Sequence, residues 1–243
     1  MLSVIVLTKN EEANISDCLS ALSWADEMLV VDSGSTDRTR ALAQKCGAKI
    51  VERTFTDFAS QRNFAMSEAK GDWVLFVDAD ERVTPELSAE IRRVLASGSA
   101  SCVYAIPRRT FFFGKPLRFS DARDDAPIRL FPRTGVRWDQ PVHEMISTDF
   151  PIKKLKYFLL HYSTRDRVHH QEKLEEYVPF ELEIMRRKGV SPSIFNVIFR
   201  PPAKFFYLYF WKLGILDGIA GLQYAILSAY YTFVKHWRFW RSK

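Results

Sequence analysis

Several features that define common protein classes are missing from this chain of 243 residues. It has three cysteines, Cys18, Cys46 and Cys102, and they form no CxxC pair. Their odd number and wide spacing argue against a disulfide framework or a zinc site, and indicate free thiols in a reducing compartment. The opening MLSVIVLTKNEE has no basic start and soon turns polar. It predicts a first strand and not a signal peptide.

Glycine-rich nucleotide motifs are missing too. No GxGxxG follows the first apolar run, and no GxxxxGKS/T occurs in the sequence. Neither a dinucleotide site nor a P-loop is therefore supported.

Acidic residues are scarce at the end of the chain. Residues 200–243 hold seven Lys and Arg but one acid, Asp217. The net charge of this segment is therefore +6, which equals the net charge of the whole protein. These cations flank the apolar runs FFYLYFW and LQYAILSAYYTFV. A nucleic-acid-binding arm needs no such runs, so the pattern favours anionic lipid over nucleic acid as the partner.

Residues 213–234 carry a single charge and are long enough to span a bilayer. Polar or small residues nevertheless recur along this run, at Asp217, Gly221, Ser228 and Thr232, and the pattern continues to Lys235 just beyond it. Such a stripe favours a helix that lies in the membrane interface over one that crosses it. Burial of the tail in a homo-oligomer interface remains open.

The first hundred residues alternate apolar runs with helical patterns. The predicted strands are SVIVL, MLVVD, AKIVE and WVLFVD, and the predicted helices lie at about 11–23, 37–46, 57–69 and 85–97. Runs rich in Val, Ile and Leu without polar alternation are typical of a parallel sheet that is covered on both faces. We expect Asn10 to cap the first helix, and Thr84 with Pro85 to open the fourth. The pattern predicts a doubly wound α/β domain.

The rest of the chain is less regular. Short strands are predicted at CVYAIP and IRLFP, and a helix near 166–188 is expected to be interrupted or kinked at Pro179. The predicted parts are an α/β domain over 1–165, a separate helix over 166–190, and an apolar, basic helical tail over 191–243.

Three polar clusters follow predicted strands: TKNEE the first, DSGSTD the second and DADE the fourth. Ligands of such sheets bind beyond the carboxyl ends of the strands. We therefore expect Asp78 and Asp80 to share an edge with Thr8, Asn10 and Asp32. Two carboxylates at such an edge suit Mg²⁺ or Mn²⁺ held against a diphosphate. A phosphatase with a strand-end DxD is a poor alternative, because such enzymes generally carry the pair after their first strand.

The motifs SVIVLTKNEEANI, VVDSGSTDRT, ASQRNFAM and GDWVLFVDADE, in this order and spacing, resemble the GT-A fold of family 2 inverting glycosyltransferases. The later QPVHE, LHYS and ILDGIAGLQYAILSAYY are similar to the branch that adds β-1,4-linked glucose to the inner-core heptose of lipopolysaccharide. The resemblance covers nearly the whole chain. It implies a metal-dependent transfer of a hexose, with glucose from UDP-glucose favoured, to a lipid-linked glycan.

The resemblance also implies roles for single residues. It assigns the donor nucleotide to Thr8, Asn10, Glu11, Asp32, Arg62, Asp78 and Arg129. For Arg129, a structural ion pair is an equal alternative to contact with a donor phosphate. Asp32 would accept a hydrogen bond from the uracil N–H, as suits an acceptor-only carboxylate. The metal would be held by Asp80, Asp78 and His161.

Glu144 in PVHE matches the catalytic base of the family, which takes a proton from the acceptor hydroxyl. Lys173 and Tyr177, four apart on one helical face, are candidates for binding an acceptor phosphate. The charged loop SDARDDAP at 120–127 receives no role.

Two other functions remain open. One is sugar transfer to a polyprenyl phosphate, which the apolar tail fits equally well. The other is a non-catalytic membrane protein that binds nucleotide sugars, against which the carboxylate pair and Glu144 argue. In each case we expect peripheral attachment to the cytoplasmic face of the inner membrane, at its inner leaflet.

Overall fold

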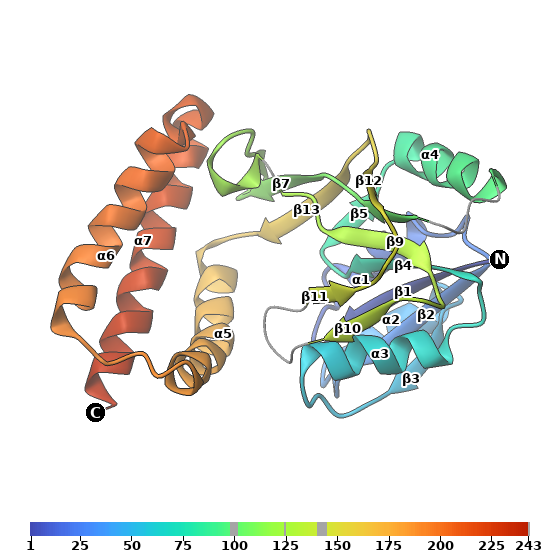
Figure 1. The fold of residues 1–243 in the computed structure, drawn as a ribbon, viewed down its shortest axis with the longest axis horizontal. Coiled ribbons are helices and arrows are strands. Elements are labelled where there is room, and N and C mark those ends of the chain that lie inside the picture. The colour runs from blue at the N-terminus through green and yellow to red at the C-terminus, as the bar shows by residue number, and fades with distance from the viewer. Residues whose placement is uncertain (98–101, 124, 140–144, 243) are drawn as a thin grey trace. The chain divides into compact units, whose positions relative to one another are not determined.

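The computed structural model of the protein describes residues 1–97, 102–123, 125–139 and 145–242. They form two compact units (Figure 1). The first unit comprises Met1–Arg108 and Ala126–His161, and the second comprises Arg109–Asp125 and Tyr162–Lys243. Each unit has hydrophobic clusters of its own. The domain boundaries predicted at 165 and 190 stay predictions.

A seven-stranded sheet in the order β12-β6-β9-β4-β1-β2-β3 forms the centre of the first unit. Its strands are β1 (Leu2–Thr8), β2 (Glu27–Asp32), β3 (Lys49–Glu52), β4 (Trp73–Asp78), β6 (Val103–Ala105), β9 (Ile128–Pro132) and β12 (Ile152–Lys154). Strands β4, β1, β2 and β3 are parallel, whereas β9 is antiparallel to β4 and β6. The prediction of a mostly parallel sheet in a doubly wound α/β unit is confirmed, with the strand order of a nucleotide-binding half.

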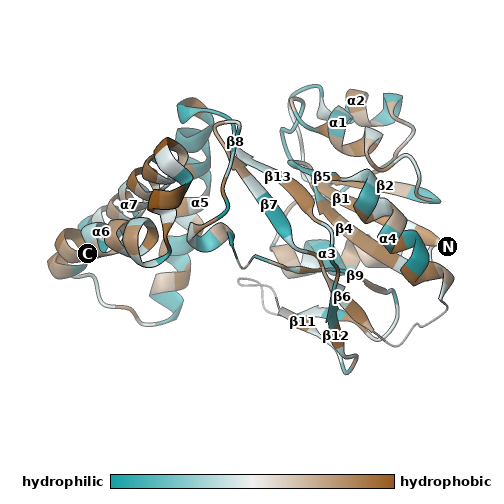
Figure 2. Cartoon of the chain, turned by 90° about the horizontal axis from the view of Figure 1, so that it is seen from above, coloured by the Kyte–Doolittle hydropathy of each residue, from teal (hydrophilic) through white to brown (hydrophobic). Residues whose placement is uncertain are grey.

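Helices cover both faces of this sheet, which explains why its strands lack polar alternation. They are α1 (Ile15–Ser20), α2 (Thr39–Lys45), α3 (Phe58–Glu68) and α4 (Pro85–Ala96). Val4 and Val6 pack in one cluster with residues of α1, α2 and α4. Ile5 points to the opposite face and packs in a second cluster with residues of α3. Figure 2 shows the apolar character of the strands between these layers.

Shorter strands complete the first unit. Strand β5 (Glu81–Val83) pairs antiparallel with the start of β13 (Leu159–Thr164), so that His161 lies opposite Glu81. Strand β10 (Arg137–Asp139) pairs antiparallel with β11 (Met145–Ser147).

One predicted helix cap is confirmed and one is wrong. Thr84 accepts a hydrogen bond from the Leu87 N–H, and Pro85 follows as the first residue of α4. Asn10, by contrast, does not cap α1, which begins at Ile15. Asn10 has a φ of 54°, and its side-chain oxygen accepts the Thr36 N–H at 2.9 Å. A partner in the next loop has replaced the local capping bond.

The second unit is largely helical. It contains the hairpin of β7 (Arg108–Phe112) with β8 (Lys115–Pro116), the 3₁₀ turn η1 (Ser120–Ala122), and the helices α5 (Arg167–Arg187), α6 (Ile194–Phe206) and α7 (Gly218–Arg241). The π-helical turn η2 (Tyr207–Trp211) and the 3₁₀ turn η3 (Gly214–Asp217) join α6 to α7. Helix α5 confirms the helix predicted near 166–188, but the interruption predicted at Pro179 is wrong, because α5 continues through this residue.

The apolar tail is a pair of helices and not one uninterrupted run. Within the described residues, no single helix has both the length and the hydropathy needed to cross a membrane. Ile194–Trp211 and Gly214–Arg241, bent by 73°, meet that criterion as a pair.

Gly221, inside α7, provides a test of how closely α7 packs on the turn before it. A Cβ atom at this position would overlap the carbonyl oxygen of Gly214 and lie 2.8 Å from its carbonyl carbon. Helix propensity alone predicts that Gly221→Ala stabilises α7 by about 0.8–1.0 kcal/mol. Steric overlap in a packed region costs roughly 1–3 kcal/mol. We expect urea denaturation to show that Gly221→Ala lowers the free energy of unfolding.

Ala203→Gly, at an exposed position of α6, calibrates helix propensity in the same unit. A stabilised Gly221→Ala variant would show that this close approach does not constrain α7.

Candidate functional site

The carboxyl ends of three neighbouring strands bring predicted site residues to one edge of the sheet. Thr8 at the end of β1 pairs with Asp32 at the end of β2, and Leu7 pairs with Asp78 at the end of β4. Thr8 is buried, and within the described residues its hydroxyl oxygen has no hydrogen-bond partner. This edge therefore holds a buried polar atom that a ligand can satisfy.

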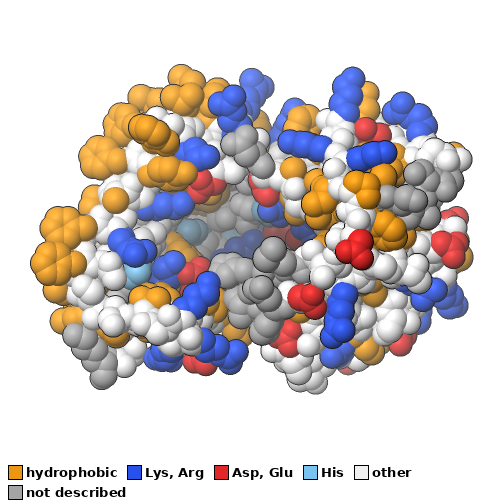
Figure 3. Space-filling view, viewed as in Figure 1, with side chains coloured by type: hydrophobic (Ala, Val, Ile, Leu, Met, Phe, Trp, Pro, Cys, Tyr) orange, Lys and Arg blue, Asp and Glu red, His pale blue; other side chains and the backbone are white. Residues whose placement is uncertain are grey.

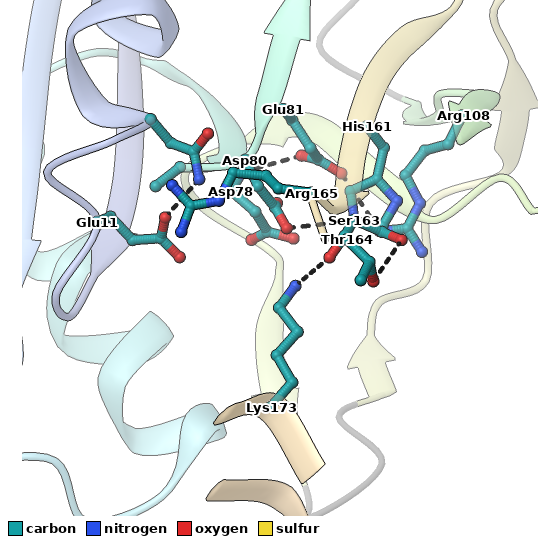
Figure 4. A network of polar contacts seen from close by, with 12 residues as sticks. Glu11, Asp78, Asp80, Glu81, Arg108, His161, Ser163, Thr164, Arg165 and Lys173 are labelled. Carbon is teal, nitrogen blue, oxygen red and sulfur yellow. Dashed lines mark hydrogen bonds and ion pairs between the residues drawn. The ribbon is translucent and has the colours of Figure 1, made fainter. Parts of the chain in front are cut away.

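The DADE segment closes a tight turn between β4 and β5. The Glu81 carboxylate accepts the Asp78 backbone N–H at 2.9 Å, and the Arg82 guanidinium donates to the Ala79 carbonyl at 2.8 Å. The turn directs Asp80 toward β13, where its carboxylate lies 3.5 Å from Nε2 of His161. Figure 4 shows Asp78, Asp80, Glu81 and His161 gathered at this turn.

Three arginines from different elements surround Asp78 and Glu81. Arg129 of β9 donates to both carboxylate oxygens of Asp78 and, at 3.0 Å, to Glu81. Arg108 donates to the same oxygen of Glu81 at 3.2 Å. Arg62 of α3 lies 3.7 Å from Asp78 and stacks over the Trp138 ring, 4.7 Å from its centroid. The cluster thus connects the strands with α3.

These contacts decide the charge states. Burial tends to raise the pKa of Asp78, but the Arg129 and Arg62 guanidinium groups outweigh it and hold that pKa well below its usual range. Burial raises the pKa of Glu81, opposed by Arg129. Arg129 remains charged, because Asp78 and Glu81 raise its pKa despite burial. The cluster therefore keeps Asp78 anionic and fixed in direction by a bidentate pair.

The loop after β2 is held by Asp32. This carboxylate is fully buried and accepts the Gly34 N–H at 3.1 Å, the Ser35 N–H at 2.8 Å and the Ser35 hydroxyl. Within this structure it stabilises the DSGSTD turn, and its contact with a uracil ring stays a prediction.

The loop after β1 is tied to the same turn. Asn10 donates its backbone N–H to the Ser35 hydroxyl at 2.9 Å, and Glu11 donates its N–H to the Thr39 hydroxyl at 2.8 Å. The structure therefore brings Asn10 and Glu11 next to the loop that Asp32 stabilises.

Three other predicted residues lie outside the described part of the first unit. Glu144 lies in 140–144, outside the described residues. Lys173 and Tyr177 belong to α5 in the second unit, where Lys173 donates to the Ser163 carbonyl at 2.6 Å (Figure 4) and Tyr177 is exposed. Their roles with an acceptor stay predictions.

A divalent cation fits the donor set at the DADE turn. In the described part of the chain, no cluster of three or more His, Cys, Asp or Glu side chains is arranged to hold a metal ion. Asp80 and His161 supply one carboxylate and one imidazole. Mg²⁺ typically takes one or two protein carboxylates and completes its shell with water and substrate phosphates. The pair therefore suits an ion that is also bound by a diphosphate.

Sequence reasoning missed the importance of Glu81 and Arg108. Glu81 directly follows the aspartate pair, and this spacing was the available signal, but its complete burial is a tertiary property. Arg108 is far from the motif in sequence and meets Glu81 through the fold.

The chain is similar to known proteins in sequence and in fold. The family model described as "Glycosyl transferase family 2" matches residues 3–157. The chain is 29% identical to the lipopolysaccharide core biosynthesis glycosyltransferase LpsC of Rhizobium meliloti (strain 1021), over 97% of this chain and 93% of LpsC. An uncharacterized glycosyltransferase of Rickettsia bellii (strain RML369-C) is 41% identical to this chain over 97 residues. These residues make up 40% of this chain and 33% of the Rickettsia protein.

Among solved structures, S. aureus TarS 1-349 in complex with UDP-GlcNAc is similar over 98% of this chain and 91% of that chain. The TM-score is 0.52 at 17% sequence identity, so this likeness concerns the fold.

Glu81→Gln tests whether the buried carboxylate holds the arginine cluster together. Removing one partner of a buried ion pair typically costs 3–5 kcal/mol, and the neutral amide retains part of the hydrogen bonding, so we expect a loss of about 3 kcal/mol in unfolding free energy. Glu86→Gln, at an exposed position of the next helix, is the matched control and is expected to have little effect. Equal unfolding curves for the two variants would contradict a structural role for Glu81.

Proposed function

The chain belongs to glycosyl transferase family 2 and has its α/β GT-A fold, and we propose that it transfers glucose from UDP-glucose to a lipid-linked glycan, such as the inner-core heptose of lipopolysaccharide. The observation that carries the proposal is the turn after β4, where Arg129 fixes Asp78 and His161 adjoins Asp80. Similarity to LpsC along 97% of the chain supports a lipopolysaccharide acceptor.

We propose that the nucleotide binds over the ends of β1, β2 and β4. Thr8, with its unsatisfied buried hydroxyl, would contact the donor there, together with Asn10, Glu11 and Asp32. Arg62 and Arg129 add positive charge beside Asp78, which suits a donor that carries a diphosphate. Asp78, already fixed by Arg129, would orient the ribose or support the metal.

Asp80 and His161, with Asp78 next to them, are the proposed holders of Mg²⁺ or Mn²⁺. When bound, such an ion neutralises charge on the departing diphosphate as a Lewis acid. The protein's own contribution is to keep Asp80 and His161 in fixed positions, since the DADE turn and the pairing of β5 with β13 determine where both side chains lie.

The transfer is proposed to be a single displacement. The acceptor hydroxyl attacks the anomeric carbon on the face opposite the nucleotide, so that a new C–O bond forms while the bond to the diphosphate oxygen breaks. The proton of the hydroxyl goes to the carboxylate of Glu144, the proposed base. One displacement inverts the configuration and requires no nucleophile from the protein.

For its location, we propose peripheral attachment at the cytoplasmic face of the inner membrane. The segment from α6 to α7, with the turns that join them, carries most of the exposed large hydrophobic side chains, which supports this location. A homo-oligomer formed through the tail stays a prediction.

The first test is release of the nucleoside diphosphate from a panel of nucleotide sugars, with Mn²⁺, Mg²⁺ or EDTA. A heptose-containing lipid and a polyprenyl phosphate serve as alternative acceptors. We expect metal-dependent UDP release from UDP-glucose with the heptose lipid, and loss of at least 100-fold in Asp80→Ala, roughly the effect of removing a major electrostatic contact. Asp72→Ala, at an exposed aspartate after α3, is the matched control.

Turnover with polyprenyl phosphate alone would replace the proposed acceptor. Full activity of Asp80→Ala in EDTA would refute the metal assignment.

The proposed base is tested by Glu144→Gln, which keeps the size of the side chain but cannot accept a proton. General-base catalysis typically contributes 10²–10⁴-fold, so we expect kcat to fall by about that factor while the KM for the donor changes little. Unchanged kcat in steady-state transfer assays would exclude Glu144 as the base.

A further inference from the structure

Helices α6 and α7 each expose a row of large hydrophobic side chains. On α7 the row consists of Ile219, Ile226, Tyr230, Phe233 and Trp237. These positions are separated by seven, four, three and four residues, so they lie on one face of the helix. On α6 the exposed large hydrophobic residues are Ile194, Phe195, Ile198, Phe199 and Phe206. Figure 3 shows hydrophobic side chains gathered over this part of the second unit.

An apolar groove lies between the two helices, and the row on α7 borders it. It has a volume of about 360 Å³ and runs between Pro201, Pro202 and Phe205 of α6 and Ile226, Ala229 and Phe233 of α7. We call the two rows and this groove the α6–α7 face. Contiguous exposed apolar surfaces of this kind mark interaction sites more often than ordinary protein surface.

The polar side of α7 is turned toward its own unit. Asp217 accepts the backbone N–H groups of Arg118 and Phe119, both at 3.0 Å. Lys235 lies 2.6 Å from Glu181 of α5. The polar stripe predicted from the sequence is thus engaged by the protein at both ends, at Asp217 and at Lys235.

Helix α5 also holds the C-terminal part of α7. Arg238 donates to both carboxylate oxygens of Glu175. Leu174 and Val178 of α5 pack with Val234 of α7. With its polar side fixed inward, α7 is oriented so that its apolar row remains outside.

Charge decides between a membrane and a second copy of this chain as the partner. Asp217 is the one acid in residues 191–243, and the structure turns it inward. Arg200 and Arg241 are exposed on the same two helices. A second copy would bring further cations and no acid to the face, whereas anionic headgroups supply the missing negative charge.

Aromatic residues agree with a lipid partner. Trp211, in the turn between the helices, is 81% exposed, and Trp237 lies in the row on α7 with the Arg241 guanidinium 6.0 Å from its ring centroid. Tryptophan and tyrosine are enriched at the boundary between headgroups and hydrocarbon.

We propose that the α6–α7 face is a docking surface for a bilayer with anionic headgroups. The two helices lie in the interface, the groove receives hydrocarbon chains, and Arg200 and Arg241 contact lipid phosphates. This inference rests on the proposed function, because a lipid-linked glycan acceptor is found at a membrane. Binding to a membrane can nevertheless be measured by itself, without a sugar donor and without sugar transfer.

The test is co-flotation of the full chain with vesicles of phosphatidylcholine, with and without phosphatidylglycerol. We expect binding to the anionic vesicles, weaker binding to the neutral ones, and partial loss in high salt because charge is screened. Ile226→Glu, in the groove, should lower the partition coefficient at least tenfold. Ile152→Glu is the matched control, because Ile152 on β12 is 62% exposed and lies outside the face. It should bind like the unchanged chain.

Three outcomes would overturn the proposal: no flotation of the unchanged chain, equal loss in both variants, or no loss in Ile226→Glu. Analytical sedimentation tests the remaining alternative, that the α6–α7 face forms a dimer. A dimer that Ile226→Glu converts to monomer, without vesicle binding, would make the face an interface between copies.

Unfolding curves show whether Ile226→Glu remains folded, and Ile219→Glu, at a 66% exposed position of the same row, repeats the test if it does not. UDP release in detergent separates the two claims: retained release with lost flotation leaves the transferase proposal intact.

Discussion

The buried contact of Arg129 with Asp78 and Glu81 is the interaction on which the candidate site depends. It connects β9, the antiparallel strand of the sheet, to the end of β4 and the start of β5. An unpaired buried charge is costly, so each of these groups is stable only while the others are in place. The strand order of the first unit and the direction of Asp78 are therefore coupled.

That coupling separates the tasks of the two aspartates. Asp78 is fixed by arginines and has a lowered pKa, whereas Asp80 lies across the turn beside His161. A diphosphate donor needs both a cationic environment and a place for a divalent ion. Asp78 lies in the cationic environment, and Asp80 lies at the place proposed for the ion.

In the second unit, packing decides which side of α7 is exposed. Helix α5 and the segment around Phe119 engage the polar side of α7, so its apolar side stays exposed.

Local patterns predicted much of the first unit correctly. Strands buried on both faces are recognisable from uninterrupted runs such as WVLFVD, and the cap of α4 lies in two adjacent residues, Thr84 and Pro85. Asn10 failed as a cap because its partner, Thr36, is 26 residues away. The spacing of DADE pointed to the site, but the partners of Glu81, Arg129 and Arg108, lie 48 and 27 residues away and belong to no local pattern.

The sequence by itself determined the α/β class, the family and the edge of the sheet where the carboxylates gather, because hydrophobic periodicity and motif order are local properties. Tertiary structure decided that Arg129 pairs with Asp78, that Glu81 is buried beside two arginines, and that α5 engages the polar side of α7. Those outcomes depend on contacts between residues far apart in the chain, such as Arg129 with Asp78 and Glu181 with Lys235. Such contacts have no periodicity, and their strength comes from burial, which exists only once the chain has folded.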